Sequence, residues 1–509
     1  MYRLDKTLPV KILLIFALFL LGCGKAEKPQ KRTITEVMMH DQGCFFYLNV
    51  ADYPRNDKKL PIGVFDSGTG GLTVLDAIVN FDEYRNQDHT FLPQGDGEKD
   101  FGNEYFIYLG DQANMPYGNY AHENKVDLLK EHIFKDVGFL LGNKYYLSVD
   151  KSQFHTDKEP VKAIVIACNT ATAYGKKDIE TFLQNAGLEM KVIGVIDAGV
   201  RGALKALGKD TAAAVGVMAT AGTVASGGYV RALKVQLNAR KFSREIPVFQ
   251  QAGIGLAGAI DGSPEYIDPS ATKPRPGYKG PSEKQAVATI DLSILNRYGF
   301  DWDGHHMLFS GDRTHPENLQ INSVGNYISY HLTALLEKIR RTPGTPPLKA
   351  IILGCTHYPF YRQVFRRKLQ QLYNYRESGK YIYRPFMAKK IVLVDPAENT
   401  AKELYEYLKS RKMFNRQDLA KSEFYISLPN RLNPEVKIDS AGNFTYEYKY
   451  GREAGYIQEY VKRVPFSKKS VAPEVVHRLS RKIPETFRLI EVFNRENPKT
   501  RLLEEIDRF

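Results

Sequence analysis

The chain has 509 residues, of which 43% are apolar and 25% are charged. This composition is typical of a globular protein with a sizeable core, and the length is enough for two to four domains. The formal net charge of +13 favours acidic partners, but no basic helix, zinc-finger spacing or aromatic-basic motif accompanies it, so we expect no nucleic-acid partner.

The N-terminal segment, residues 1–23, has the features of a lipoprotein signal. Its apolar run lies within residues 12–24, which is shorter than the about 20 residues that span a bilayer. The run ends in Leu-Leu-Gly-Cys, which resembles the lipobox of bacterial lipoproteins. We therefore expect lipidation at Cys23, a membrane-anchored lipoprotein on the periplasmic or cell-surface side of a bacterium, and a polar tether over residues 24–57. A plain secretory signal and a short anchor with a cytoplasm-facing protein are the alternatives.

From residue 62 onward, short apolar strands alternate with helices. Continuous apolar strands in such an alternation predict parallel sheets with both faces covered, so the expected fold class is α/β. Ligands of these sheets bind beyond the carboxyl ends of the strands. Polar clusters follow the predicted strands at Asp66, Cys168, Asp197, Thr220, Cys355 and Asp395.

Polar stretches interrupt the alternation. Residues 262–300 are rich in proline and glycine and predict a surface excursion or lid, within an insertion of about 262–325. Beyond about residue 411 the alternation stops. Residues 411–509 then form a C-terminal extension with short strands, for which a packed cap is the ordinary interpretation.

The glycine-rich turn DSGTGG, residues 66–71, places a carboxylate and a hydroxyl beside backbone N–H groups at a helix start. It lacks the lysine of a phosphate-binding loop and the last glycine of a dinucleotide fingerprint. Such donors and acceptors suit an ammonium and a carboxylate, the two groups of an amino acid.

Cys168 and Cys355 occur in matching settings. Each ends an apolar strand, each precedes short hydrogen-bonding residues, and each opens a helix whose N-terminus favours the thiolate. Two thiols on opposite sides of one carbon can remove a proton from one face and return one to the other. A structural role for the cysteines is the alternative. A zinc site with Asp66 and His357 would need a spacing that matches no common zinc signature, so we expect no metal.

Six segments, in order, resemble those of the cofactor-independent glutamate racemases of the aspartate/glutamate racemase superfamily. They lie within about residues 60–410 and read IGVFDSGTGGLTVL, YLGDQANMPYG, IVIACNTATAYG, GVMATAGTVASGGYVRAL, LGCTHYP and LVDPAENTA. The resemblance implies two facing α/β domains with the active site in the cleft between them. One would comprise residues 58–198 plus 388–410, and the other residues 199–387.

The resemblance also implies an activity: an isomerase that interconverts L- and D-glutamate and supplies D-glutamate for peptidoglycan, and so for cell-wall organisation and cell shape. It implies no pyridoxal phosphate, no other cofactor and no metal. The oligomeric state stays open, with a homodimer as one option.

The same resemblance assigns roles to residues. Cys168 would be the base for D-glutamate and Cys355 the base for L-glutamate, with Asp66 and His357 assisting the thiols on their respective sides. Where the family usually shows Glu-Pro, this chain has Asp197-Ala198, which leaves an assisting carboxylate one methylene shorter. The implied substrate-binding residues are Ser67, Pro116, Tyr117, Gly118, Asn169, Thr170, Thr220, Thr223 and Thr356.

Two further functions remain open at this point. The chain can be an amino-acid-binding or regulatory lipoprotein that keeps the pocket without turnover, or a racemase for another amino acid such as aspartate. The presence of both cysteines together with Asp66 and His357 favours the enzyme, because a binding protein has no need of two opposed thiols.

Overall fold

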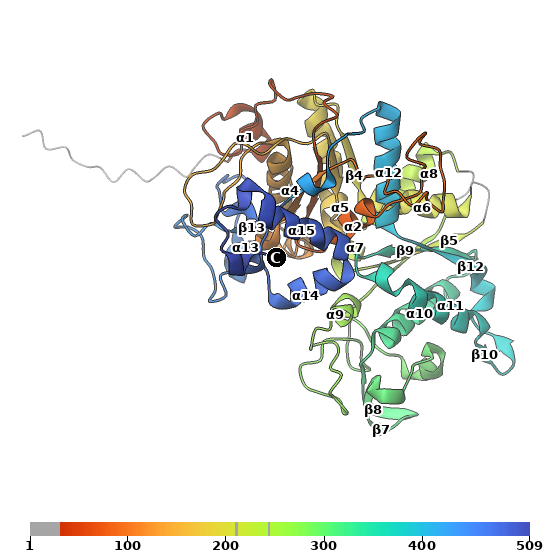
Figure 1. Ribbon diagram of the computed structural model, residues 1–509. Coiled ribbons are helices and arrows are strands. Elements are labelled where there is room, and N and C mark those ends of the chain that lie inside the picture. Colours follow the sequence, from red (N-terminus) through yellow and green to blue (C-terminus); the bar gives the residue numbers. More distant parts are fainter. Residues whose placement is uncertain (1–30, 209–211, 243–244) are drawn as a thin grey trace, which may run out of the picture.

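A computed structural model describes residues 31–208, 212–242 and 245–509, which form two lobes, each built on its own main sheet (Figure 1). The first sheet has six strands in the order β14-β13-β2-β1-β3-β4. Adjacent strands of this sheet are parallel, except for β13 and β14, which pair in antiparallel orientation. The strands are β1 (Ile62–Asp66), β2 (Phe106–Gly110), β3 (Ala163–Ile166), β4 (Lys191–Gly194), β13 (Glu423–Pro429) and β14 (Val461–Pro465).

The second sheet has four strands, all parallel, in the order β12-β9-β5-β6. Two antiparallel hairpins, β7-β8 and β10-β11, lie outside both main sheets. The mainly parallel pairing confirms the predicted α/β class. The strands are β5 (Ala214–Ala219), β6 (Val248–Ala252), β7 (Met307–Asp312), β8 (His315–Ile321), β9 (Leu348–Gly354), β10 (Arg376–Glu377), β11 (Lys380–Tyr381) and β12 (Met387–Val394).

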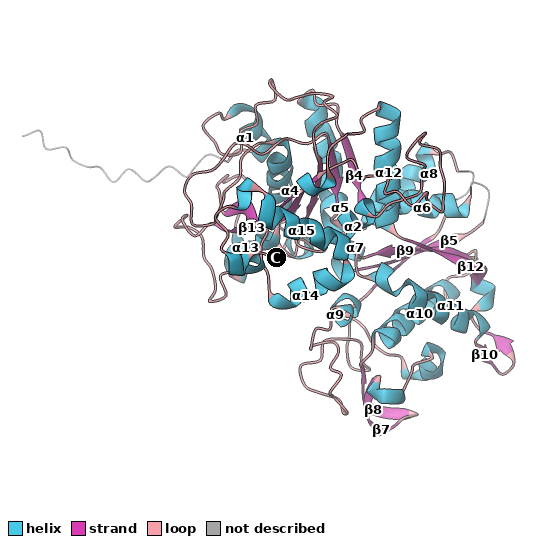
Figure 2. Cartoon of the chain, viewed as in Figure 1, coloured by secondary structure: helices cyan, strands magenta, loops and turns pink. Residues whose placement is uncertain are grey.

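Helices enclose the two main sheets, as the alternating sequence predicts (Figure 2). The α-helices are α1 (Ile34–His40), α2 (Leu72–Val79), α3 (Gly118–His122), α4 (Val126–Leu141), α5 (Asn169–Asn185), α6 (Val195–Leu207), α7 (Ala221–Ala225), α8 (Gly228–Ala239), α9 (Leu256–Ile260), α10 (Val324–Arg340), α11 (Arg362–Asn374), α12 (Pro396–Arg411), α13 (Tyr446–Gly451), α14 (Pro473–Lys482) and α15 (Pro484–Glu496).

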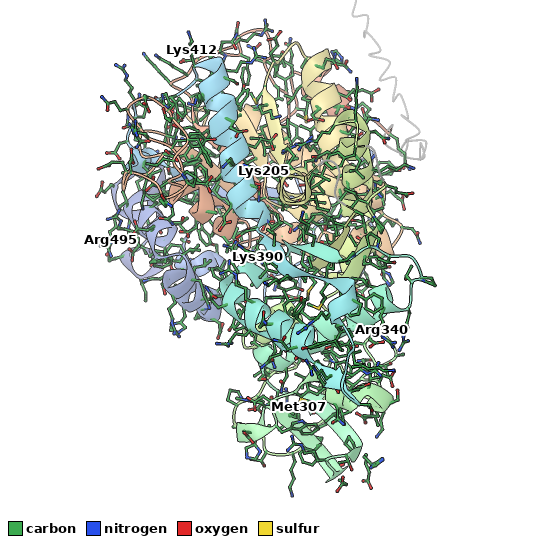
Figure 3. The ribbon with its side chains drawn as sticks, turned by 90° about the vertical axis from the view of Figure 1, so that its right-hand side faces the viewer. Lys205, Met307, Arg340, Lys390, Lys412 and Arg495 are labelled. Atoms are coloured by element: carbon green, nitrogen blue, oxygen red, sulfur yellow. The ribbon has the colours of Figure 1, made fainter. Side chains whose placement is uncertain are left out.

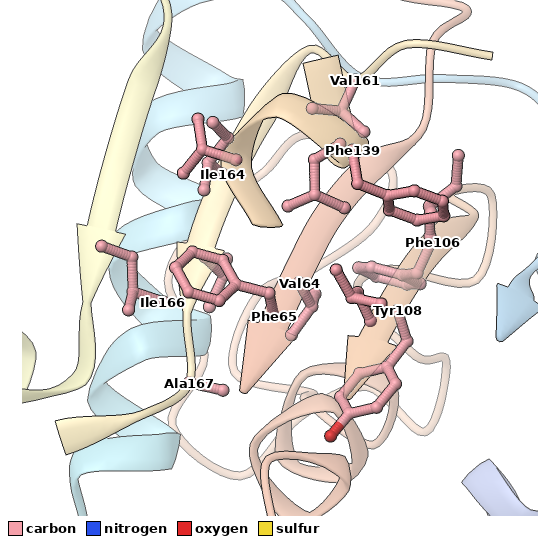
Figure 4. Packing of buried hydrophobic residues seen from close by; sticks show 14 of the residues in the cluster. Val64, Phe65, Phe106, Tyr108, Phe139, Val161, Ile164, Ile166 and Ala167 are labelled. Atoms are coloured by element: carbon pink, nitrogen blue, oxygen red, sulfur yellow. The ribbon is translucent and has the colours of Figure 1, made fainter. Parts of the chain in front are cut away.

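The core of the first lobe surrounds β1, all of whose residues are buried. Figure 4 shows Val64 and Phe65 of β1 near Ile164 and Ile166 of the adjacent strand β3. A strand covered on both faces needs apolar side chains at every position rather than at alternate ones. This requirement explains the continuous apolar run from which the strand was predicted.

The predicted segment 388–410 is divided between the lobes. Strand β12 pairs with β9 and so extends the second sheet. Helix α12, which follows it, packs against α2 and α6. The domain boundaries themselves stay a prediction.

The C-terminal segment, residues 411–509, completes the first lobe. Strand β13 pairs in parallel with β2, and α15 packs against both α2 and β13. In Figure 1 this segment, coloured dark blue, lies against the earliest part of the chain, coloured red to orange. The segment therefore covers an edge of β2 that would otherwise present unpaired backbone groups.

Residues 31–57 do not form the predicted polar tether. Helix α1 begins with a capping box between Thr33 and Glu36, and it packs against α4. Its buried residues Ile34, Val37 and Met38 follow helical spacing, which a low overall hydrophobicity obscures. Residues 24–30 lie outside the described part of the chain.

The insertion after α9 projects from the second lobe. Figure 3 shows Met307, at the start of β7, at the opposite end of the molecule from Lys412. The hydroxyls of Tyr278 and Tyr327 lie 3.0 Å apart and join the insertion to α10. This segment therefore forms a surface excursion, one of the two alternatives that its composition left open.

The fold predicts a measurable cost for a truncation in β3. Ile164 is fully buried, so Ile164→Ala should lower the free energy of unfolding by about 2–5 kcal/mol through lost burial and a residual cavity. Urea denaturation followed by circular dichroism measures this change. The control is Val235→Ala on α8, whose side chain is 66% exposed and should cost less than about 0.5 kcal/mol. Equal losses in the two variants would contradict the assigned core.

Candidate active site

A cavity of about 1590 Å³ lies between the carboxyl ends of the two main sheets. The residues that follow β1, β3, β5 and β9 all contribute to its wall. The position agrees with the rule that ligands of parallel sheets bind beyond the strand ends. Among the described residues, none from 262–325 lines the cavity.

Asp66 ends β1 and is buried at the base of the glycine-rich turn. Its carboxylate accepts hydrogen bonds from the backbone N–H groups of Gly68, at 3.2 Å, and Gly71, at 2.9 Å. A Cβ atom at position 71 would lie 2.4 Å from the Cβ of Asp66, so this turn requires glycine there. Burial raises the pKa of the Asp66 carboxyl despite these hydrogen bonds, which makes the carboxylate a better proton acceptor.

Cys168 caps the N-terminus of α5. Its Sγ accepts a hydrogen bond from the backbone N–H of Ala171 at 3.4 Å and lies 3.7 Å from Oγ of Ser67. Burial raises the pKa of this thiol to about 12, and the charge of nearby Asp66 adds to the effect. The hydrogen bond from the N–H of Ala171 at the helix start lowers the pKa of the thiol, but the larger effect of burial outweighs it.

Cys355 follows β9 in the other lobe. Its Sγ lies 3.5 Å from Nδ1 of His357. Burial raises the pKa of the thiol to about 12, and the charge of Asp261 adds to this rise. Burial lowers the pKa of the His357 imidazole, an effect that the charge of Asp261 partly counteracts. Both thiols are thus protonated in the empty site at neutral pH.

The two lobes are joined directly beside the thiols. Nδ2 of Asn169, at the start of α5, donates to the carbonyl oxygen of Gly354 at 3.2 Å. The hydroxyl of Tyr229 on α8 donates to Oδ1 of the same asparagine at 2.9 Å. Farther along the wall the lobes approach at two glycines, since a Cβ atom at Gly222 would lie 3.2 Å from Cα of Gly118.

The structure brings nearly all the predicted site residues to this one cavity. Tyr117 turns its hydroxyl away from the cavity, toward the carboxylates of Asp111 and Asp136, each 2.6 Å distant. Asp197 is the exception, since it does not line the cavity and its Oδ2 lies 3.7 Å from Nζ of Lys176. The predicted residues in the wall are Asp66, Ser67, Pro116, Tyr117, Gly118, Cys168, Asn169, Thr170, Thr220, Thr223, Cys355, Thr356 and His357.

Among the lining residues that sequence reasoning missed, two groups bear on the chemistry of the site. One is Asp261, which directly follows the short helix α9. The other comes from the C-terminal segment, namely the end of β13, the loops and short 3-10 helix that follow, and helix α14, where no motif or periodicity marks a site. This second group comprises Ser427, Leu428, Pro429, Arg431, Ala441, Gly442, Asn443, Lys469, Ser470, Val471, Ala472, Val475 and Arg478.

Within residues 31–208, 212–242 and 245–509, no three His, Cys, Asp or Glu side chains are grouped in a way that could hold a metal ion.

Two thiols from strand ends of different lobes thus line one cavity of a two-lobed α/β fold. The chain is 34% identical over 389 residues to the glutamate racemase of a Thermus thermophilus strain, a match that covers 75% of this chain and 95% of that protein. It is 31% identical over 354 residues to glutamate racemase of Lactobacillus johnsonii, a match that covers 70% and 83%. No family model matches the chain.

The chain therefore belongs to the glutamate racemase family, and the predicted enzyme class, an amino-acid racemase, is confirmed. Among solved structures it is similar to a glutamate racemase isoform of Bacillus anthracis, with 22% identity, coverage of 72% of this chain and 87% of that chain, and a TM-score of 0.40.

The predicted localisation as a membrane-anchored lipoprotein is wrong. The similar proteins are described as glutamate racemases and not as lipoproteins. Over the part of the chain that the structure describes, no helix is both long and apolar enough to cross a membrane. The lipobox resemblance rested on four residues, whereas the family relation extends over most of the chain. The segment concerned, with Cys23, lies outside the described residues.

The buried thiols predict a slow reaction with alkylating agents. With a pKa of about 12, Cys168 and Cys355 should react with iodoacetamide at pH 8 at least about 100-fold more slowly than in the urea-unfolded chain, where a thiol has a pKa near 8.5. Peptide mass spectrometry measures each rate separately. Because a raised pKa lowers the thiolate fraction, the folded rates should keep rising above pH 9, and a plateau there would contradict the assigned burial.

Proposed function

We propose that this protein interconverts L- and D-glutamate by moving a proton at Cα between two thiols, with no cofactor. One observation carries the proposal: Cys168 and Cys355 come from strand ends of different lobes and line the same cavity. A substrate held between them would present one face of its Cα to each lobe. Removal of the proton on one side and delivery on the other inverts the configuration.

On the first side, Cys168 is the base for D-glutamate and Asp66 assists it. The buried carboxylate has a raised pKa, so it can hold the proton that leaves the thiol. Ser67 lies within contact distance of the sulfur and stabilises the thiolate that forms. On the second side, Cys355 is the base for L-glutamate, and its proton passes to His357, whose Nδ1 is 3.5 Å away.

The substrate itself offsets the cost of forming a buried thiolate. An α-ammonium group between the sulfurs attracts negative charge and lowers the pKa of both thiols from the high values of the empty site. The polar side chains of the wall that would hold the ammonium and the α-carboxylate include Asn169, Thr170, Thr220, Thr223 and Thr356. The loop Pro116–Gly118 is the proposed binding site for the side-chain carboxylate of glutamate.

The wall also contains cationic side chains that could pair with the carboxylates of glutamate. Arg431, Lys469 and Arg478 from the C-terminal segment line the cavity together with the predicted residues. Cations around a concave site raise the local concentration of an anionic substrate. We propose that the C-terminal extension serves as one wall of the active site, and that the D-glutamate formed there supplies peptidoglycan synthesis.

The reaction is tested by proton exchange at Cα. The full chain, in deuterated water under reducing conditions and with no added cofactor, should remove the α-proton signal of L-glutamate in NMR spectra and produce D-glutamate. Binding without exchange would favour a pocket kept for ligand binding. Exchange of aspartate, but not of glutamate, would move the substrate assignment to aspartate.

Replacement of single thiols tests the two-base mechanism. Cys168→Ser and Cys355→Ser should each lower racemisation by at least about 1000-fold, because a serine hydroxyl is far too weak a base at neutral pH. Each variant should keep one half-reaction, measured as elimination from a suitable glutamate analogue of one configuration. Cys44→Ser is the matched control, since Cys44 does not line the cavity, and it should leave the rate unchanged. Full racemisation by both active-site variants would refute the mechanism.

A further inference from the structure

Helix α14 of the C-terminal segment contacts both lobes. Its Leu479, together with the following Ile483, is buried in the core of the first lobe. Its other face reaches the second lobe, where Nη1 of Arg478 lies 3.0 Å from Oδ2 of Asp261 and Nζ of Lys482 lies 5.2 Å from the ring centroid of Phe360. Figure 1 shows α14 next to α9, far from it in sequence.

Asp261 connects this helix to the catalytic cleft. One carboxylate oxygen, Oδ2, pairs with Arg478, while the other, Oδ1, lies 3.3 Å from Nε2 of His357. The opposite ring nitrogen, Nδ1, lies 3.5 Å from Sγ of Cys355. Four groups thus follow one another from the C-terminal helix to the sulfur, and the imidazole stands between a thiol and a carboxylate.

This order has a chemical consequence. When the proton of Cys355 moves to Nδ1, the S–H bond breaks, an N–H bond forms, and a thiolate faces an imidazolium. A carboxylate at Nε2 stabilises the imidazolium and fixes the ring orientation, as the acid does in acid–base–nucleophile triads. The charge of Asp261 also raises the pKa of the Cys355 thiol. Because the carboxylate is paired with the imidazole, which stands between it and the sulfur, we expect its support of the imidazolium to be the larger effect.

Arg478 has a distinct part in this arrangement. Asp261 directly follows α9, and a carboxylate at the C-terminal end of a helix lies in an unfavourable field. The guanidinium compensates this charge at one oxygen. The other oxygen, which is buried and accepts no hydrogen bond from the described residues, is the one beside the imidazole. The side chain of Asp261 is only 20% exposed, so water compensates little of its charge.

We propose that Asp261 and Arg478 are positioning residues for His357, so that a helix of the C-terminal segment sets the geometry of the Cys355 side of the active site. The inference rests on the proposed function and deepens it. It assigns to Asp261 the assistance that the family resemblance would give to Asp197, which lies outside the cavity and faces Lys176.

The experiment compares the alkylation of the two thiols within one protein. The full chain and its variants are treated with iodoacetamide at pH 8, and peptide mass spectrometry gives the rates at Cys355 and Cys168. Asp261→Asn should lower the ratio of the Cys355 rate to the Cys168 rate by about tenfold, since one pKa unit of lost imidazolium support corresponds to that factor. A general structural defect would change the alkylation rates of both thiols by the same factor and leave their ratio unchanged.

Arg478→Ala should lower the same ratio by about threefold to tenfold, because the freed carboxylate turns toward water, and Arg478→Lys should restore most of it. In the Asp261→Asn background, Arg478→Ala should have no further effect, as expected of a residue that acts through Asp261. Arg481→Ala is the matched control, because Arg481 is an exposed arginine of the same helix with no ion pair among the described residues.

An unchanged ratio in Asp261→Asn, an additive effect of Arg478→Ala in that background, or an equal effect of Arg481→Ala would each overturn the inference. The kcat for racemisation should fall about tenfold in Asp261→Asn and Arg478→Ala, with KM for glutamate changed less. If the unaltered chain forms no D-glutamate, the proposed function fails, while the alkylation ratios still decide whether Asp261 and Arg478 position His357.

Discussion

The site depends on one constraint: parallel strands present all their carboxyl ends at the same edge of a sheet. In each lobe the apolar strands stop at this edge, and the chain turns there into a helix. The turns carry the polar side chains, so the two main sheets, placed with these edges around one cavity, bring Asp66 and Cys168 to face Cys355 and His357. No single motif forms this site, since each contributes only one part of the wall.

Burial of the two thiols has opposite effects on stability and on chemistry. A neutral thiol is a small apolar group that packs well at the end of a buried strand. The same burial raises the pKa of each thiol and thereby keeps it protonated until an opposite charge arrives. In the proposed reaction the substrate's ammonium group supplies this charge. A protein that buries its bases in this way stays unreactive when empty.

The C-terminal segment shows how structural and functional demands coincide. Its strand β13 covers the edge of β2, which stabilises the first sheet, and its arginines reach a buried network below the site. Nη2 of Arg463 lies 3.0 Å from Oδ1 of Asp136, which shares the hydroxyl of Tyr117 with Asp111. Helix α14 then extends from the same segment to Asp261. The segment thus contacts both the loop at Tyr117 and Asp261, the proposed positioning residue for His357.

The sequence by itself determined the α/β class, the parallel sheets and thirteen residues of the cavity wall. These features arise from local signals, namely apolar runs that end in short polar turns, and both cysteines lie at such ends. The tether prediction was wrong because three buried side chains of α1 are too few to stand out in a polar stretch. Localisation was inferred wrongly from a short motif at the N-terminus.

Only the tertiary structure decided the remainder. The place of Asp261, the distance of Asp197 from the cavity, and the reach of Arg478 across the cleft depend on how the two lobes and the C-terminal segment pack. No local pattern encodes such contacts, because they join residues that are remote in sequence and lie on loops or on a short helix. The raised pKa of both thiols likewise follows from desolvation. Desolvation depends on the surrounding atoms rather than on neighbouring residues in the chain.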